Sequence, residues 1–284
     1  MIRQAIIPLA GQGTRLLPLT SVFAKELLPI NGKPGIEYIL DECVNAGIKE
    51  IVFIISKKKK LIKKDFYNNL FYKKIINKNK DVRIIKEYKK IKKYKKIIKF
   101  VYQNNPKGTG DAVLKTKNLI KDNFFLMLLP DDLIIKRNCS KDMISIHNKK
   151  KCSVMASMKV NKNTVDRWGI YSKGSSINKN NFYIKDVVEK PKIKSAPSNN
   201  AVIGRYILPK KIFSKLVNQK KGKGGEVHIT DSIRRLIVEG DKFIGHTFKG
   251  KYLDCGTMKG YISSSLEISK IWNFVWLEPV MLVL

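Results

Sequence analysis

Apolar runs and amphipathic segments alternate through the first part of the chain. The apolar run QAIIPLA, which begins at residue 4, predicts a buried strand. In GIEYILDECVNAG, residues 35–47, apolar residues recur at helical spacing as far as Gly47, which favours an amphipathic helix that ends there. A second apolar run, KEIVFIIS, predicts a parallel strand after that helix. This order of strand, helix and strand is typical of a βαβ unit.

A lysine-rich segment at residues 57–99 then interrupts the alternation. Apolar residues at helical spacing predict that this segment forms surface helices beside the sheet: Leu61, Ile62, Phe66, Leu70, Phe71 and Ile75. Further buried strands are expected in three apolar runs, IIKFVYQ, NFFLMLLPDD and KCSVMASMKV. Between the first two of these runs, GTGDAVLKTKNLI predicts a glycine loop that opens a helix.

Beyond residue 160 the apolar runs are broken by Gly, Asn and Pro. The segments WGIYS, FYIKDVVEKP and NNAVIGRYILP predict short antiparallel strands that are added to the sheet. A helix is expected in GEVHITDSIRRLIVEG, with Thr230 as its N-cap and Gly240 at its end. KYLDCG predicts a last strand, which ends at Asp254, and a terminal helix follows it. The whole pattern predicts an α/β protein with a parallel first half and a mixed second half.

The length and composition fit one large domain. The chain has 284 residues, of which 43% are hydrophobic, so it is long enough to bury a core. We expect a single domain at residues 1–262, followed by a C-terminal helix and tail at 263–284. No apolar stretch approaches the ~20 residues of a membrane span, so no membrane partner is expected. The four cysteines are scattered without a CxxC pair, which predicts reduced thiols in a cytoplasmic protein.

The charge of the chain is strongly positive. Lys and Arg number 57 and Asp and Glu number 23, which gives a net charge of +34. Such a charge is typical of nucleic-acid binding. However, the excess is mostly lysine mixed with Ile and Asn, residues that share A/T-rich codons, whereas arginine, which forks onto phosphate, is sparse. We therefore expect no specific nucleic-acid partner, only non-specific binding that is lost near ~200 mM salt.

Candidate chemistry follows the predicted strands, where open α/β sheets bind their ligands. The stretch LAGQGTRLLP lacks the third glycine of a dinucleotide-binding GxGxxG, because Leu16 stands at that position, and it lacks the Gly-Lys-Ser/Thr of a P-loop. By itself it is also compatible with a plain turn. Arg15 favours a phosphate cradle, since a guanidinium beside backbone N–H groups binds phosphate oxygens well. Asp131 and Asp254 end apolar strands, and if they converge they would suit Mg²⁺.

Eight segments, in order from about residue 5 to residue 261, resemble the bacterial UTP–glucose-1-phosphate uridylyltransferases, a family of sugar-nucleotide pyrophosphorylases. They are AGQGTRLLPLT, KELLPINGKPGIEYILDECVNAGI, GTGDAVL, LPDD, VVEKPK, APSNNAVIGRYIL, GGEVHITDSI and DCGTMKGY. The segments VEKPK, APSNNAVIGRY and GGEVHITDSI are more similar to the uridylyl branch than to the thymidylyl branch. The resemblance implies a Rossmann-like nucleotidyltransferase fold with a mixed, mostly parallel central sheet flanked by helices.

The resemblance also implies a role for individual residues. The expected catalytic cations are Arg15, Lys25 and Lys190. The expected nucleotide-binding residues are Ala10, Gly11, Gly13, Glu26, Gln103 and Gly108, with Gln103 reading the uracil. The expected residues for the sugar phosphate are Gly169, Glu189, Lys190 and Gly204. Asp131 and Asp254 would hold Mg²⁺, and His228 is expected to have a structural or supporting role.

The implied reaction transfers uridylyl from UTP to glucose 1-phosphate and releases pyrophosphate. A phosphate monoester with a second pKa near ~6 is mostly ionised at neutral pH, so its attack needs no general base. The resemblance further implies a homo-oligomer, a dimer or a tetramer. Two alternatives stay open at this point: a glucose-1-phosphate thymidylyltransferase that uses dTTP, and a decayed relative without catalysis. The chain departs from the family pattern at Ser21, Ala24 and Trp168, none of which has a predicted catalytic role.

Overall fold

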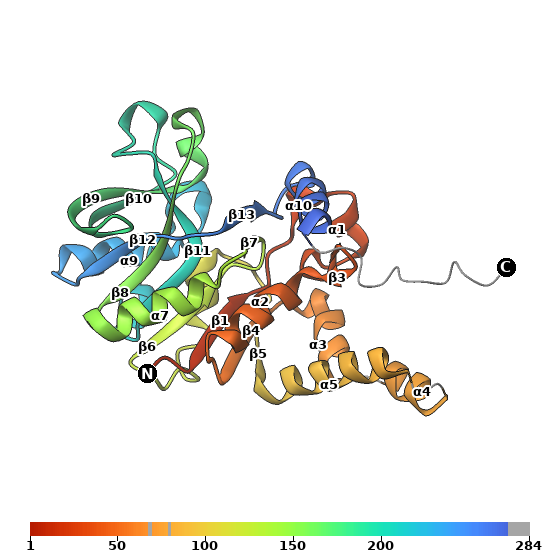
Figure 1. Ribbon diagram of the computed structural model, residues 1–284. Coiled ribbons are helices and arrows are strands. Elements are labelled where there is room, and N and C mark those ends of the chain that lie inside the picture. The colour runs from red at the N-terminus through yellow and green to blue at the C-terminus, as the bar shows by residue number, and fades with distance from the viewer. Residues whose placement is uncertain (68–69, 79–80, 272–284) are drawn as a thin grey trace.

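A nine-stranded sheet forms the centre of the molecule (Figure 1). The structure, a computed structural model, describes residues 1–67, 70–78 and 81–271. The strand order is β5-β4-β1-β6-β11-β8-β12-β10-β9. The predicted parallel half is confirmed, because β4 and β6 both pair in parallel with β1, and β5 pairs in parallel with β4. The bounds of these strands are β1 Gln4–Pro8, β4 Glu50–Ile55, β5 Ile98–Tyr102 and β6 Phe124–Leu128.

The second half of the chain adds long strands to the central sheet, and one of them lies in its interior. This arrangement differs from the expectation of short strands added to the sheet. The remaining strands are β8 Ser153–Lys159, β9 Gly169–Asn178, β10 Asn181–Glu189, β11 Asn200–Pro209 and β12 Phe243–Thr247. The antiparallel β11 lies between β6 and β8, and all ten of its residues are buried. It is a core strand because its apolar side chains pack on both faces of the sheet: Ile203 and Ile207 belong to one apolar core, and Val202 and Leu208 belong to the other. The strand β12, parallel to β8, was not predicted, because its short sequence FIGHT mixes apolar residues with Gly and His.

Helices cover both faces of this sheet. Along β1, Ala5 and Ile7 pack into one apolar core and Ile6 into the other, as the two-residue period of a strand requires. The first core is covered by α2 (Gly35–Asn45) and α7 (Cys139–Lys150), and the second by α6 (Thr109–Leu114), α8 (Ile212–Val217) and α9 (Ile229–Val238). The layers are therefore helix, sheet and helix.

The start of α9 corrects one prediction. The N-cap is His228, not Thr230, which is buried inside the first turn. The backbone N–H of Ile229 donates to the hydroxyl of Thr109, 3.2 Å away, so a side chain from another loop caps this helix. Gly240 follows the helix in a left-handed conformation, as predicted.

The lysine-rich segment forms an arm of helices beside the sheet (Figure 1): α3 (Lys60–Tyr67), α4 (Leu70–Lys78) and α5 (Val82–Ile97). Its predicted apolar face is only partly confirmed, because Ile62 is buried but Leu61 is 53% exposed. The side chains of Phe66, Leu70 and Phe71 lie outside the described residues. The arm is attached to α2 through an ion pair of Lys90 with Glu37, 2.9 Å apart.

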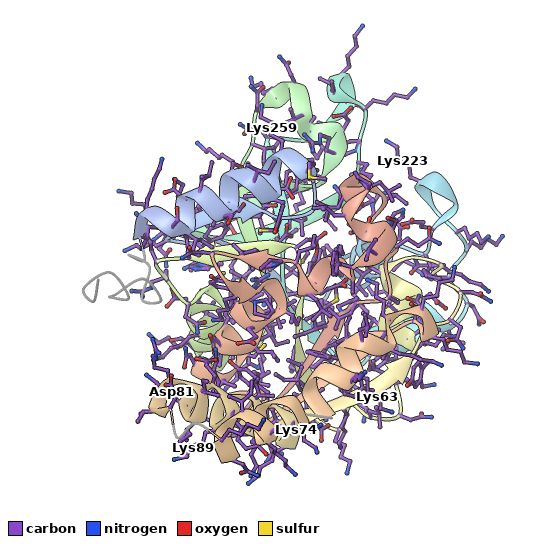
Figure 2. All side chains as sticks on the ribbon, turned by 90° about the vertical axis from the view of Figure 1, so that its right-hand side faces the viewer. Lys63, Lys74, Asp81, Lys89, Lys223 and Lys259 are labelled. Atoms are coloured by element: carbon purple, nitrogen blue, oxygen red, sulfur yellow. The ribbon has the colours of Figure 1, made fainter. Side chains whose placement is uncertain are left out.

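Lys63, Lys74 and Lys89 of the arm are exposed and point outward (Figure 2), whereas Lys90 faces Glu37 of α2. This distribution fits a solvated surface charge.

Small elements complete the fold around the strand ends. They are α1 (Leu19–Val22), the two-stranded pairs β2 (Pro29–Ile30) with β3 (Lys33–Pro34) and β7 (Asp132–Ile135) with β13 (Lys251–Asp254), and α10 (Met258–Ile271). The expected boundary at residue 262 falls inside α10, and the division into a domain and a tail stays a prediction. Within the described ranges, no helix is both long and apolar enough to cross a membrane.

Candidate active site

The loop after β1 contains two glycines, and the structure explains the need for glycine at only one of them. Gly13 has φ 73°, and a Cβ added there would lie 3.0 Å from Cγ2 of Thr20, so the fold itself requires glycine. Gly11 has no left-handed backbone, and a Cβ added there would meet nothing within 4 Å. The adjacent Ala10 is buried. Since no protein contact accounts for Gly11, this position has open space for a ligand beside the backbone.

A compact charge cluster lies next to this loop. The ammonium of Lys25 donates to Oδ2 of Asp131 at 2.6 Å, and Nη2 of Arg15 is 3.7 Å from the same oxygen. Burial alone would raise the pKa of Asp131, but the charge and hydrogen bond of Lys25 lower it below its usual value. Burial also opposes the charge on Lys25, yet the carboxylates of Asp131 and Glu26 raise the pKa of its amine. Asp131 and Lys25 are therefore both held in their charged forms.

Asp254 reaches this cluster by a different route from the expected one. It ends β13, which belongs to the small sheet with β7 and not to the central sheet. The backbone N–H of Cys255 donates to the carbonyl of Asp131 at 2.8 Å, which brings the two segments together. A Cβ added at Gly256 would lie 2.8 Å from Oδ2 of Asp131, 3.1 Å from Nη2 of Arg15 and 3.2 Å from Oδ1 of Asp254. The three charged side chains therefore border one small space.

The two carboxylates beside this space are candidate ligands for a cation that also binds a phosphate. In residues 1–67, 70–78 and 81–271, no group of three or more His, Cys, Asp or Glu side chains could hold a metal. Asp131 and Asp254 supply two carboxylates only. That donor set suits Mg²⁺, which is usually bound by one or two carboxylates while substrate phosphates and water complete its coordination.

Gln103 and Gly108 form a second group at the end of β5. Gln103 is buried, and its amide nitrogen donates to Oδ2 of Asp111 at 2.6 Å and to the carbonyl of Gly108 at 3.3 Å. Gly108 has φ 112°, and a Cβ there would lie 2.6 Å from the carbonyl oxygen of Val227. The glycine is thus needed for packing against the loop before α9. Sequence reasoning missed Asp111, although it lies in the quoted GTGD segment and fixes the Gln103 amide.

Glu26, which was expected to contact the nucleotide, is buried in an ion pair instead. Both of its carboxylate oxygens accept from the ammonium of Lys59 at 2.8 Å, and its side chain is fully buried. Burial lowers the pKa of Lys59, whereas the Glu26 carboxylate opposes this change. A direct nucleotide contact by Glu26 would require this pair to open. Lys59 was not predicted, because nothing in the run SKKKK distinguishes one buried lysine from its exposed neighbours.

A third group carries the residues expected to bind the sugar phosphate. Gly169 and Glu189 pair across β9 and β10, and a Cβ on Gly169 would lie 3.3 Å from Oε2 of Glu189. Oε1 of Glu189 is 4.0 Å from Nζ of Lys190 and 3.9 Å from Nδ1 of His228. Among the described residues, no donor lies within hydrogen-bond distance of this largely buried carboxylate. Lys190 has φ 44°, a strained backbone for a residue with a side chain, and such strain is common at functional sites.

Gly204 lies against the second aspartate of the LPDD segment. Its backbone N–H donates to Oδ2 of Asp132 at 2.9 Å, and Oδ1 accepts from the hydroxyl of Tyr252 at 2.6 Å. Burial, assisted by the charge of Asp131, raises the pKa of Asp132 to about 6. Asp132 therefore ties Gly204 to the strand end that carries Asp131. Tyr252, which sequence reasoning missed, also packs edge-on against Trp168, with ring centroids 5.9 Å apart.

Together these residues have the properties expected of one class of enzyme. Arg15, Lys25, Asp131 and Asp254 lie in one cluster, with the open glycine Gly11 beside them, and the carboxylate of Glu189 at the end of β10 has no donor among the described residues. An α/β sheet with this arrangement defines an enzyme that binds and transfers phosphate-linked groups. The chain belongs to the nucleotidyl transferase family, whose pattern matches residues 4–271.

Individual relatives agree with this assignment over almost the full length of the chain. The UTP–glucose-1-phosphate uridylyltransferases of Mycoplasma pneumoniae and Bacillus subtilis are each 35% identical, covering 100% and 94% of this chain and 98% and 91% of their own. A crystal structure of UDP-glucose pyrophosphorylase complexed with UDP-glucose is 36% identical, with a TM-score of 0.85, and covers 96% of this chain and 100% of that one. The resemblance and the fold class predicted from the sequence are confirmed.

Proposed function

We propose that this enzyme transfers uridylyl from UTP to α-D-glucose 1-phosphate and releases pyrophosphate. The observation that carries the proposal is the cluster of Arg15, Lys25, Asp131 and Asp254 around the space beside Gly256. The similarity to uridylyltransferases over nearly the full chain supports UTP as the nucleotide.

The main obstacle to this reaction is electrostatic repulsion, because a sugar-phosphate dianion must approach the α-phosphate of a triphosphate. The nucleophile is already ionised at neutral pH, so no side chain has to remove a proton. Arg15 and Lys25 would hold the triphosphate and stabilise the charge that develops on the leaving pyrophosphate. Asp131 keeps both cations oriented, since it contacts each of them.

Mg²⁺ would be held by Asp131 and Asp254 with the substrate phosphates, where it supplies further positive charge. The release of Lys25 from Asp131 would then free its ammonium for phosphate. This sharing of one carboxylate explains why both a lysine and an aspartate are needed at the same point.

The remaining predicted residues would select the substrates. Ala10, Gly11 and Gly13 would line the nucleotide with backbone, and Gln103 would read the uracil edge through its amide. Glu189 would accept hydrogen bonds from the glucose hydroxyls, and Lys190 would pair with the 1-phosphate. Supporting this assignment, the Glu189 carboxylate has no hydrogen-bond donor among the described residues and is partly exposed, so a ligand that donates can reach it.

The experiment that tests the proposal measures pyrophosphate release from a panel of nucleotides and sugar phosphates with Mg²⁺. We expect the highest kcat/KM for UTP with glucose 1-phosphate. A tenfold or greater preference for dTTP would assign the enzyme to the thymidylyl branch instead. Absence of turnover with any pair would identify a decayed relative. Asp131→Ala should abolish turnover, and unchanged turnover would contradict the metal and phosphate roles.

We also propose that the enzyme acts as a homo-oligomer, a dimer or a tetramer. Exposed apolar side chains near α1 and on α10 support a subunit contact: Leu17, Val22, Phe23, Ile262 and Leu266. Sedimentation equilibrium tests this proposal, and a monomer at micromolar concentration would contradict it.

A further inference from the structure

The loop that precedes α9 contacts both halves of the proposed site. On the nucleotide side, the N–H of Val227 donates to the carbonyl of Lys107 and the N–H of Gly110 donates to the carbonyl of Val227, each at 2.7 Å. On the sugar side, the next residue, His228, faces Glu189, and the ammonium of Lys223 donates to the carbonyl of Lys190. The position of His228 is thus fixed relative to the proposed nucleotide and sugar sites.

The hydrogen-bond partner of His228 shows which ring nitrogen carries a hydrogen. The side chain is 6% exposed, and Nε2 lies 2.7 Å from the carbonyl oxygen of Lys223. A carbonyl oxygen can only accept, so Nε2 carries the hydrogen. In the neutral ring, Nδ1 is then a hydrogen-bond acceptor.

That acceptor faces a second acceptor. Nδ1 of His228 is 3.9 Å from Oε1 of Glu189, beyond hydrogen-bond distance, and neither atom has a hydrogen-bond donor among the described residues. Gly169 leaves the other carboxylate oxygen uncovered because it has no side chain, whereas a Cβ at that position would lie only 3.3 Å from Oε2. Neither atom is among the fully buried unpaired polar atoms of the described residues, so both are open to a third molecule that can donate hydrogens to them. A sugar, whose neighbouring hydroxyls each donate one hydrogen, meets this requirement.

We propose that His228 is a specificity-determining residue that accepts a hydrogen bond from a hydroxyl of the hexose at Nδ1, beside the hydroxyl bound by Glu189. This inference rests on the proposed function and adds a residue to its sugar site. Lys223 orients the ring, and the loop joined to Gly110 positions it. Binding of a nucleotide sugar whose hexose has hydroxyls at both places is therefore favoured over binding of the nucleotide without a hexose.

Two substitutions separate the ring's two contacts. In His228→Gln, the side-chain amide can still donate to the carbonyl of Lys223 from the position of Nε2, but no acceptor is left at the position of Nδ1. In His228→Asn, the amide oxygen replaces Nδ1 and the contact with Lys223 is lost. Isothermal titration with UDP and with UDP-glucose then measures what the sugar adds to binding, and the UDP affinity reports whether the nucleotide half is folded.

For the wild-type enzyme we expect tighter binding of UDP-glucose than of UDP. In His228→Gln this preference should fall by about tenfold, the value of one hydrogen bond, while UDP affinity stays within about twofold of wild type. His228→Asn should keep most of the preference. In turnover, His228→Gln should raise KM for glucose 1-phosphate and leave KM for UTP unchanged.

The opposite order, with normal His228→Gln and impaired His228→Asn, would overturn the inference, because it would mean that only the loop anchor matters. A full sugar preference in both variants would overturn it as well. Either result leaves the proposed function intact if the wild-type enzyme prefers UDP-glucose and releases pyrophosphate. A wild-type enzyme that binds neither ligand would overturn the proposed function and this inference together.

Discussion

Replacement of Arg205 by methionine should destabilise the fold strongly. The Arg205 side chain has no exposed surface, and its guanidinium donates to both carboxylate oxygens of Glu42 at 2.8–3.1 Å. Nη1 also donates to the carbonyls of Gly204 at 2.9 Å and Leu129 at 3.3 Å. The methionine would fill a similar volume, but it would leave Glu42 buried with only the donors of Ser140. Loss of one partner of a buried ion pair costs about 3–5 kcal/mol, which is the expected decrease in unfolding free energy.

Urea denaturation followed by circular dichroism measures this decrease, and the double variant Glu42→Met with Arg205→Met is the matched control. Because no charge remains buried in the double variant, its stability should return to within about 1 kcal/mol of wild type. If Arg205→Met alone cost less than about 1 kcal/mol, or if the double variant were as unstable as the single one, the reasoning from burial would be refuted.

Two further predictions test glycine and acid effects. Gly11→Ala should keep wild-type stability but weaken UTP binding. Gly108→Ala should destabilise the fold, because its Cβ would collide with a backbone carbonyl. Thermal unfolding measures the stability of both variants, and titration with UTP measures their binding. Burial alone would raise the pKa of Asp41, but hydrogen bonds from Lys33 and Tyr94 lower it. The stability that results is present above the unfolded-state pKa near ~4, and it is lost as pH falls through the pKa of the folded state. Asp41→Asn should therefore be less stable than wild type at pH 7 and should lose less stability on acidification.

Local patterns predicted the elements well but their arrangement less well. The strand β1 and the helix α2 were readable because period and end signals agree in them. The central place of β11 was not readable, because strand order depends on which faces find partners after the chain has returned to the sheet. Thr230 was assigned as a cap for a similar reason: a helix start can be capped from outside, here by Thr109, and local sequence does not contain that information.

The candidate site shows the same limit at the level of side chains. Lys25, Asp131 and Arg15 were named from motifs, and the structure brings them together. The partners that fix predicted residues were missed, since Asp111 and Lys59 look like ordinary surface residues in sequence. Their burial arises from tertiary contacts, which give a charged side chain a defined role only after the fold is formed.

The loop LAGQGTRLLP matches neither the GxGxxG nor the P-loop pattern, and the structure shows why this mismatch is compatible with nucleotide binding. A P-loop places its phosphate cation within the loop, next to its last glycine. Here the cations come from two segments, Arg15 from the loop and Lys25 from the segment after α1, and Asp131, in the turn between β6 and β7, contacts both. Because the charge is assembled from three segments, the loop itself needs only an open backbone at Gly11 and a turn at Gly13. A motif search confined to the loop would therefore find two glycines and overlook the site that they border.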